Sequence, residues 1–247
     1  MERANKHRIK MKNTMKNKMK TGSWNFNFLD SYSFEKHIER SVPDYLFTHN
    51  LIIQLSHFFL FENSTIVDIG STTGNLITKI INETSKEKLK FIAIEPEIKM
   101  VNVFKKNIKK KKLKNIKIIN KSFEKCKIPK SDLIISHYTI QFIKPSERQN
   151  AFNKIYKSLH TGGAFIFFEK IIGNNSRFEN IFNSLLIDYK ITNKFTSDEI
   201  LNKSKSLRGV MDPCKDIENI KFLKKTGFSK IQTIHQKINF KGYLCIK

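Results

Sequence analysis

The chain has 247 residues, of which 39% are hydrophobic, which is enough for one α/β domain with a modest addition and a real core. It has no apolar run of about eighteen residues, so we expect no membrane-spanning segment. The formal net charge of +24 indicates either a nucleic-acid partner or a general compositional bias toward lysine. The basic runs hold few aromatic residues, which favours bias, with non-specific binding of nucleic acid to the basic surface at low salt.

The first 22 residues are strongly basic. Eight Lys and Arg side chains are opposed by Glu2, and no apolar periodicity runs through the segment. This composition predicts a disordered basic tail over residues 1–22, followed by a single domain over residues 23–247. The tail also lacks the apolar core of a secretory signal.

Three cysteines stand far apart in the chain, at Cys126, Cys214 and Cys245, and no C-x-x-C pair occurs. The histidines do not share the spacing of metal ligands either. We therefore expect reduced thiols, no bound metal and a cytoplasmic location.

A helical pattern over residues 44–59 precedes the most informative segment of the chain. Residues 65–69 form a short apolar run that predicts a buried strand, and the loop after it contains Gly70 and Gly74. A second apolar run, about twenty residues later, ends in Glu95. A strand, a glycine turn, a helix and an acid at the tip of the next strand are typical of a nucleoside site. The glycines let the backbone approach the ligand, and the acid accepts hydrogen bonds from ribose hydroxyls.

The spacing of the glycines indicates which nucleoside. From Asp68 to Gly74 the pattern is D-x-G-x-x-x-G, whereas a dinucleotide fold requires G-x-G-x-x-G to hold a pyrophosphate. The pattern resembles motif I of S-adenosylmethionine (SAM)-dependent methyltransferases. The alternative is an ordinary α/β turn that requires glycine for its geometry alone.

The remaining pattern predicts an α/β fold of the Rossmann-like methyltransferase type. We expect a seven-stranded, mostly parallel sheet with an antiparallel C-terminal hairpin and helices on both faces. The helix over 145–159 should end at a glycine cap formed by Gly162 and Gly163, and a helical insertion should occupy about 173–210. The other predicted helices are 98–111, 176–192, 196–207 and 214–226, and the other strands are 91–94, 116–119, 132–136, 164–169, 229–236 and 240–246.

Two further segments carry a more specific resemblance. Residues 40–45 read Arg-Ser-Val-Pro-Asp-Tyr, and residues 138–149 read Tyr-Thr-Ile-Gln-Phe-Ile-Lys-Pro-Ser-Glu-Arg-Gln. Together they closely resemble the carboxy-SAM synthases, and the likeness extends over roughly residues 22–247. The family is implied to use SAM and prephenate, to release phenylpyruvate, and to supply a carboxymethyl sulfonium for wobble-uridine modification of tRNA by a second enzyme. The resemblance also implies a homodimer in which the inserted helices exchange contacts.

The resemblance implies roles for particular side chains at matching positions. Tyr45 would contact the methionine part of SAM, Ser122 and Phe123 would lie at the adenine, and His137 would face the sulfonium. The full implied set of cofactor-binding residues is Tyr45, Asp68, Gly70, Ser71, Thr72, Gly74, Glu95, Pro96, Ser122, Phe123, His137 and Ser204.

The chain departs from the family pattern at four of these positions. Glu95 and Ser122 replace aspartates, and His137 replaces an asparagine. Ser204 stands where the family has an arginine that grips the new carboxylate, and serine cannot copy the bidentate fork of a guanidinium. Arg208 lies one helical turn further on, on the same face, and could substitute.

Three functions remain open at this point. The first is a divergent carboxy-SAM synthase in which Arg208, or a neighbouring lysine such as Lys203 or Lys205, grips the carboxylate. The second is a conventional SAM-dependent methyltransferase of a small molecule or of tRNA, with His137 as general base because an unperturbed imidazole titrates near neutrality. The third is a non-catalytic binding partner, against which the intact glycine loop argues.

Overall fold

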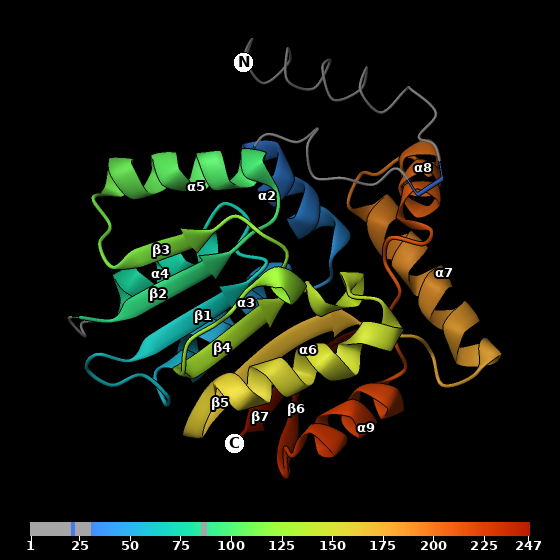
Figure 1. Cartoon of the computed structure of the whole chain (residues 1–247). Coiled ribbons are helices and arrows are strands. Elements are labelled where there is room, and N and C mark those ends of the chain that lie inside the picture. Colours follow the sequence, from blue (N-terminus) through green and yellow to red (C-terminus); the bar gives the residue numbers. More distant parts are fainter. Residues whose placement is uncertain (1–20, 23–30, 85–87) are drawn as a thin grey trace.

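The computed structural model describes residues 21–22, 31–84 and 88–247. Apart from Thr21 and Gly22, the predicted basic tail lies outside the described residues. The described chain forms one seven-stranded sheet in the order β3-β2-β1-β4-β5-β7-β6 (Figure 1). The strands are β1 Thr65–Ile69, β2 Lys90–Ile94, β3 Ile116–Ile119, β4 Ser131–His137, β5 Leu159–Lys170, β6 Lys230–Lys237 and β7 Phe240–Ile246. The first five strands are parallel to one another, and β7 pairs antiparallel with both β5 and β6.

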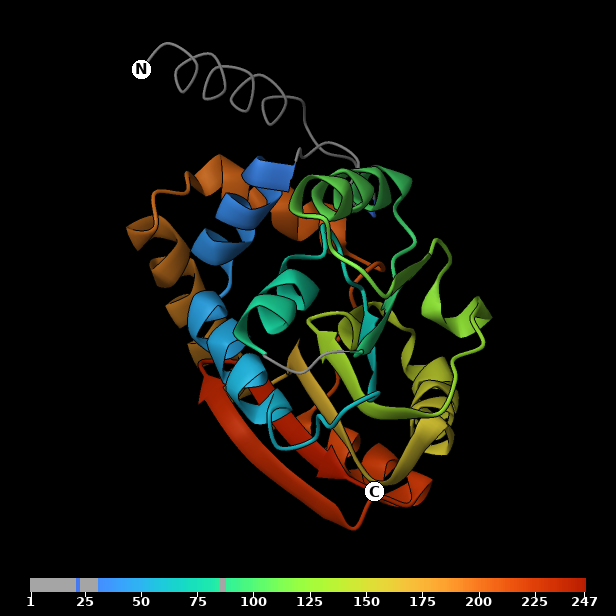
Figure 2. The same cartoon turned by 90° about the vertical axis from the view of Figure 1, so that its left-hand side faces the viewer.

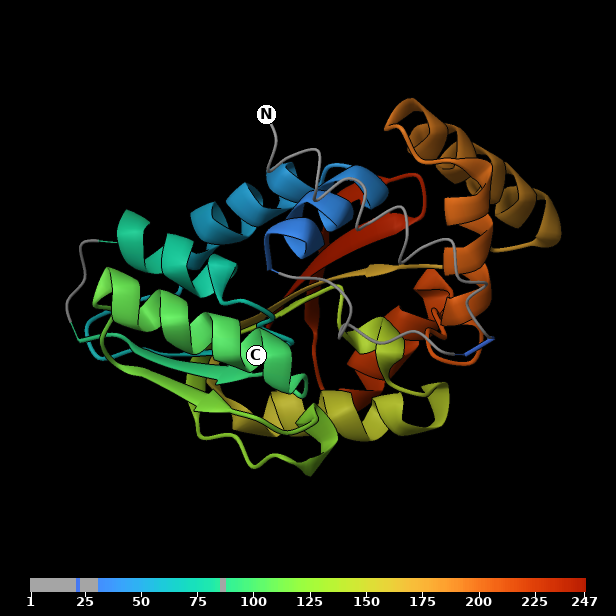
Figure 3. The ribbon, with the colours of Figure 1, turned by 90° about the horizontal axis from the view of Figure 1, so that it is seen from above.

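Helices cover both faces of the sheet, as Figure 3 shows from above. They are α2 Ser31–Ser41, α3 Tyr45–Ser56, α4 Asn75–Glu83, α5 Ile98–Lys111, α6 Pro145–Ser158, α7 Ser176–Thr192, α8 Ser197–Leu207 and α9 Asp216–Thr226. Alternate residues of each strand point to opposite faces. Ile66 therefore packs into one core with α3, α4 and α5, and Val67 into a second core with α6 and α9. This is the predicted fold.

Three helices gather where the parallel strands end. α7 and α8 follow β5 along the chain, and α2 lies beside α7 (Figures 1 and 2). Arg40 Nε of α2 donates to the Asn193 carbonyl at 2.8 Å, and the guanidinium lies 4.5 Å from the ring centre of Phe195. In a parallel sheet ligands bind at this carboxyl edge, so α2, α7 and α8 can enclose one.

The prediction for the end of α6 was wrong. The helix ends at Ser158, its C-cap Leu159 is extended, and β5 starts there and runs through both Gly162 and Gly163. The glycines join the sheet because Gly162 N donates to the Lys247 carbonyl at 2.8 Å, and Lys247 N donates to the Gly163 carbonyl at 3.0 Å. Helix α2 was not predicted at all. No helix in the described part of the chain is long and apolar enough to cross a membrane.

Candidate cofactor and substrate site

The glycine loop lies directly against the tip of the neighbouring strand. Gly70 N and Ser71 N both donate to the Ile94 carbonyl, at 2.8 and 3.1 Å. Gly70 has φ +78° and Gly74 has φ +76°, a region that favours glycine. A Cβ atom on Gly70 would overlap the side chain of Thr139, so this position requires glycine for space as well as for conformation.

Glu95 is held rigidly at the end of β2. Its side chain is buried, Oε2 accepts the backbone N–H of Thr72 at 2.8 Å, and Oε1 accepts that of Glu97 at 2.9 Å. Burial raises the pKa of Glu95 to about 7, although these two hydrogen bonds favour the charged form. Each carboxylate oxygen keeps a further lone pair, so both can also accept a hydroxyl. A ribose with two adjacent hydroxyls fits this arrangement.

Asp68 is a second buried acid in the same region. Burial, together with the nearby Glu95 charge, raises the pKa of Asp68 to about 7. Asp68, Ser71 and Tyr45 line a small cavity of about 30 Å³ between α3 and the glycine loop. Two carboxyl groups in a confined space favour a positively charged ligand, and the amino and sulfonium groups of SAM have that charge.

His137 ends β4 among the aromatic rings of α3. Its ring lies 4.9 Å from that of Tyr45 and 5.1 Å from that of His49. Thr48 Oγ1 donates its hydrogen to the Tyr45 carbonyl at 2.9 Å, and it lies 3.0 Å from His137 Nε2. Because a hydroxyl has one hydrogen, Thr48 accepts a hydrogen bond from His137 Nε2. The neutral ring therefore carries its proton on Nε2, and Nδ1 is unprotonated. Burial, with a smaller contribution from His49, lowers the pKa of His137 well below its ordinary value, against the expectation of titration near neutrality.

A large cavity of about 810 Å³ adjoins the small one, with Gly70, Thr72 and His137 in both walls. Its volume is in the range of pockets that bind cofactors and substrates. Among the implied site residues, the large cavity is lined by Gly70, Thr72, Glu95, Pro96, His137, Ser204 and Arg208. It therefore extends from Glu95, after β2, to helix α8, where Ser204 stands in place of the family arginine.

Three implied residues line neither cavity. Gly74 lies under Phe104 of α5, whose ring would overlap a Cβ atom on this glycine. Ser122 caps a short 3-10 turn, and the buried Phe123 follows it beneath the Lys154 ammonium, 4.7 Å from the ring centre. Their proposed contact with the adenine stays a prediction.

Sequence reasoning missed two of the four Lys and Arg side chains that line the cavity. Lys170 ends β5, Lys190 belongs to α7 and Lys203 to α8, and all three line it. No motif marks lysines that come from separate elements. Lys203 is one of the sequence candidates near Ser204, whereas the sequence assigns no binding role to Lys170 or Lys190.

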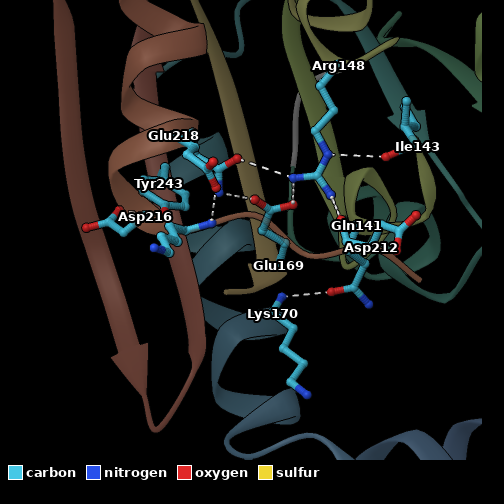
Figure 4. A network of polar contacts seen from close by, with 11 residues as sticks. Gln141, Ile143, Arg148, Glu169, Lys170, Asp212, Asp216, Glu218 and Tyr243 are labelled. Atoms are coloured by element: carbon cyan, nitrogen blue, oxygen red, sulfur yellow. Dashed lines mark hydrogen bonds and ion pairs between the residues drawn. The ribbon is translucent and has the colours of Figure 1, made fainter. Parts of the chain in front are cut away.

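A buried polar network supports this end of the cavity (Figure 4). Arg148 of α6 and Glu169 of β5 are fully buried, and Nη1 lies 3.6 Å from Oε2. Arg148 also donates to the carbonyls of Ile143 at 3.2 Å and Asp212 at 2.6 Å, and Asn219 of α9 donates to Glu169. Burial raises the pKa of Glu169 to about 7 against the effect of the Arg148 charge. The network fixes β5 to α6 and α9, immediately before Lys170.

Comparison with known proteins agrees with this geometry. A family model described as a methyltransferase domain matches residues 66–163. A SAM-dependent methyltransferase from Aquifex aeolicus has the same fold, with a TM-score of 0.57 at 16% identity over 88% of this chain and 98% of that one. A putative enzyme of the same kind from Methanococcus maripaludis gives a TM-score of 0.55 at 20% identity over 87% and 90%. Fold and site together define a SAM-dependent transferase of the methyltransferase superfamily.

Curated relatives narrow the assignment. The carboxy-S-adenosyl-L-methionine synthase of Staphylococcus epidermidis is 35% identical over 87% of this chain and 92% of its own. That of Nautilia profundicola is 32% identical over 87% and 90%. The chain belongs to the carboxy-S-adenosyl-L-methionine synthase family, as the two sequence segments predicted.

Proposed function

We propose that the protein converts SAM and prephenate into carboxy-SAM, phenylpyruvate and water. Prephenate loses its ring carboxyl group as CO2 together with its ring hydroxyl, the SAM methyl carbon loses a proton and captures the CO2, and the proton and the hydroxyl leave as water. The observation that carries the proposal is one continuous cavity that joins Glu95, at the nucleoside end, to Ser204 and Arg208 on α8. A cofactor alone would not need the far end, so the cavity has room for a second substrate beside the methyl group. The family membership of the chain supports the same reaction.

The residues of the chain divide the work of binding. Glu95 accepts the ribose hydroxyls, and Tyr45 and Asp68, which line the small cavity beside the glycine loop, contact the methionine part. SAM supplies a methyl group made acidic by the adjacent sulfonium. The neutral imidazole of His137 contributes an uncharged wall with an unprotonated Nδ1 beside that region, and residues of α2, α7 and α8 line the same cavity.

The clamp for the carboxylate differs from that of the family. Ser204 is exposed on α8, and Arg208 caps the same helix with φ −62° and ψ 123°, and both line the cavity. Arg208 thus leaves the helix at its last turn yet faces the same space as Ser204. This supports Arg208 as one group that can reach a carboxylate in place of the family arginine.

The experiment is mass spectrometry of the ligand that copurifies with the protein, followed by turnover with SAM and prephenate. Carboxy-SAM supports the proposal. The second candidate, a conventional methyltransferase of a small molecule or tRNA, is favoured by one observation, the loss of the family arginine at Ser204. S-adenosylhomocysteine in the purified protein, with prephenate left unchanged, would support that candidate instead.

We also propose a homodimer formed through α7. Phe178, Ile181 and Leu185 form an apolar stripe along one face of this helix and are 44–50% exposed. Burial of the stripe against a second copy agrees with the family resemblance. Light scattering should give a dimer mass, and a Leu185→Glu variant should give a monomer.

The remaining proposals concern the setting of the enzyme. The product would serve tRNA modification through a second enzyme, and the +24 charge would give weak, salt-sensitive binding of nucleic acid. The three cysteines are unpaired and buried, which supports a reducing compartment such as the cytoplasm.

A further inference from the structure

Three lysines from three separate elements converge on the far end of the large cavity. Lys170 ends β5, Lys190 lies in the last turn of α7, and Lys203 lies in α8 beside Ser204. Each is half-buried. The charge of Lys190 acts on that of Lys203, and the charge of Lys170 acts on that of Lys190. The fold has therefore brought like charges together inside a hollow.

No acid of the described chain is in direct contact with the ammonium group of Lys170 or Lys190. Within the residues that the structure describes, the ammonium groups of Lys170 and Lys190 form neither an ion pair nor a hydrogen bond. Glu179 is near enough for its charge to favour the charged form of Lys170, but it forms no ion pair with that lysine, and its two oxygens accept from Gly173 N at 2.7 Å and Asn183 Nδ2 at 3.0 Å.

The other neighbours are uncharged or occupied. Lys203 Nζ lies 2.7 Å from His37 Nε2 and 3.2 Å from Ser41 Oγ. Burial, followed by the Lys203, Arg40 and Lys190 charges, lowers the pKa of His37 well below its ordinary value, so the ring is neutral. Arg40 is directed to the Asn193 carbonyl.

The acids that do line the cavity lie at its opposite end. Glu95 and Glu97 follow β2, which is separated from β5 by β1 and β4. Three strand spacings put the tips of β2 and β5 about 14 Å apart. The cavity is thus acidic where a nucleoside and a cation would bind and basic where a second ligand would bind.

Burying like charges beside one another is costly, and the cost appears in their titration. Burial, with repulsion from Lys190, lowers the pKa of Lys203 to about 7, and burial with repulsion from Lys170 lowers that of Lys190 to about 8. An anion between the lysines would favour their charged forms and raise both pKa values. Near pH 8 part of the Lys190 and Lys203 population is neutral, so these lysines must take up protons when an anion binds.

We propose that Lys170, Lys190 and Lys203 together bind the carboxylate groups of the second substrate, between the end of β5 and the helices α7 and α8. The inference rests on the proposed function and assigns the side chains that hold the two carboxylates of its second substrate. Leu186, Leu207 and Phe240 supply apolar wall for its carbon skeleton. The lysines share the role of the missing arginine at Ser204.

Calorimetry tests the proposal on the full chain saturated with S-adenosylhomocysteine, which cannot react. Prephenate is titrated at pH 7.8 in two buffers of different ionisation enthalpy, and malonate serves as a second, non-reacting dicarboxylate. Binding of either acid should be accompanied by proton uptake. Lys190→Met and Lys203→Met should each weaken binding of the acid about tenfold or more, with S-adenosylhomocysteine affinity unchanged.

Two further variants separate a binding role from a structural one. Lys203→Arg keeps the charge but cannot titrate in this range, so it should retain most of the affinity and reduce the proton uptake. Lys205→Met, on the same helix but outside the cavity lining, should bind both acids like the wild type. Thermal unfolding of Lys203→Met is measured beside the wild type, so that the change in affinity is determined on folded protein.

Binding of the acids without proton uptake, and with unchanged affinity in Lys190→Met and Lys203→Met, would overturn the proposal. Failure of the proposed function gives a different result: both acids bind through the lysines, but SAM and prephenate yield no carboxy-SAM. Restoring the family residue with Ser204→Arg in a Lys190→Met/Lys203→Met background should recover part of the lost affinity. No recovery would argue that the carboxylate binds elsewhere.

Discussion

Thr72 and Glu95 are joined by a hydrogen bond of 2.8 Å, from the backbone N–H of the first to Oε2 of the second. The contact links the loop after β1 to the acid that ends β2, the two parts of the chain that form the nucleoside end of the cavity. Thr72 has φ +48°, so the loop is held in a left-handed conformation that this bond helps to stabilise. The acid therefore shapes the loop beside the place where we propose that it accepts the ribose hydroxyls.

Glu95→Ala should weaken SAM binding. The change removes the acceptor of the ribose hydroxyls and releases the backbone N–H groups of Thr72 and Glu97. A hydrogen bond to a charged group contributes about 1.5–3 kcal/mol, so the dissociation constant should rise by about tenfold or more for each bond lost. Calorimetry with S-adenosylhomocysteine measures it. Glu95→Asp is the control and should stay within a few-fold of wild type, and equal affinity for Glu95→Ala would remove this residue from the site.

Gly70→Ala should destabilise the protein more than Gly162→Ala. The two glycines have nearly the same φ, +78° and +81°, but a Cβ at Gly162 meets no atom within 4 Å, whereas at Gly70 it meets Thr139. The shared conformational cost is about 1–2 kcal/mol, and overpacking adds about 1–3 kcal/mol at Gly70 alone. Urea unfolding gives both values. Equal losses would mean that Thr139 yields freely and that the close approach is unimportant.

The contrast between these glycines shows what sequence could and could not predict. The glycine turn after β1 and the position of Glu95 just after β2 were predicted correctly because each depends on neighbours in the chain. Gly162 was predicted wrongly as a helix cap, because its partner in the sheet is Lys247, which no local pattern indicates. Lys170 and Lys190 likewise lie near each other because α7 packs against the carboxyl ends of the strands. The residues at the proposed substrate end of the site are therefore brought together by packing between elements that are distant in the sequence.

The buried pair of Arg148 and Glu169 should be costly to break on one side. Arg148→Met leaves a carboxylate without its partner in the core, and loss of one member of a buried ion pair costs about 3–5 kcal/mol. The double variant Arg148→Met/Glu169→Leu should lose less stability than Arg148→Met alone, because no charge is left unpaired. Denaturant unfolding of both variants supplies the comparison. Additive losses would show that the two side chains act independently.

The neutrality of His137 predicts a specific pH dependence. The unfolded imidazole takes up a proton as the pH falls through about 6.5, whereas the folded ring does not, so acid favours unfolding through this residue. At pH 5.5 the loss should be about 1.4 kcal/mol relative to pH 7.5. His137→Asn should lose less stability over that interval, by about this amount. The imidazole C–H resonance should stay constant from pH 8 to 5.5, and a titration near pH 6.5 would restore His137 as a candidate base.

Formation of carboxy-SAM from SAM and prephenate is the central proposal, and one measurement tests it directly. Purified protein is incubated with SAM and prephenate, and the sulfonium and keto-acid products are quantified together by mass spectrometry over time. We predict carboxy-SAM and phenylpyruvate in equal amounts, formed at a rate that depends on both substrates. SAM that binds and remains unchanged in the presence of prephenate, with no phenylpyruvate above the uncatalysed rate, would contradict the account.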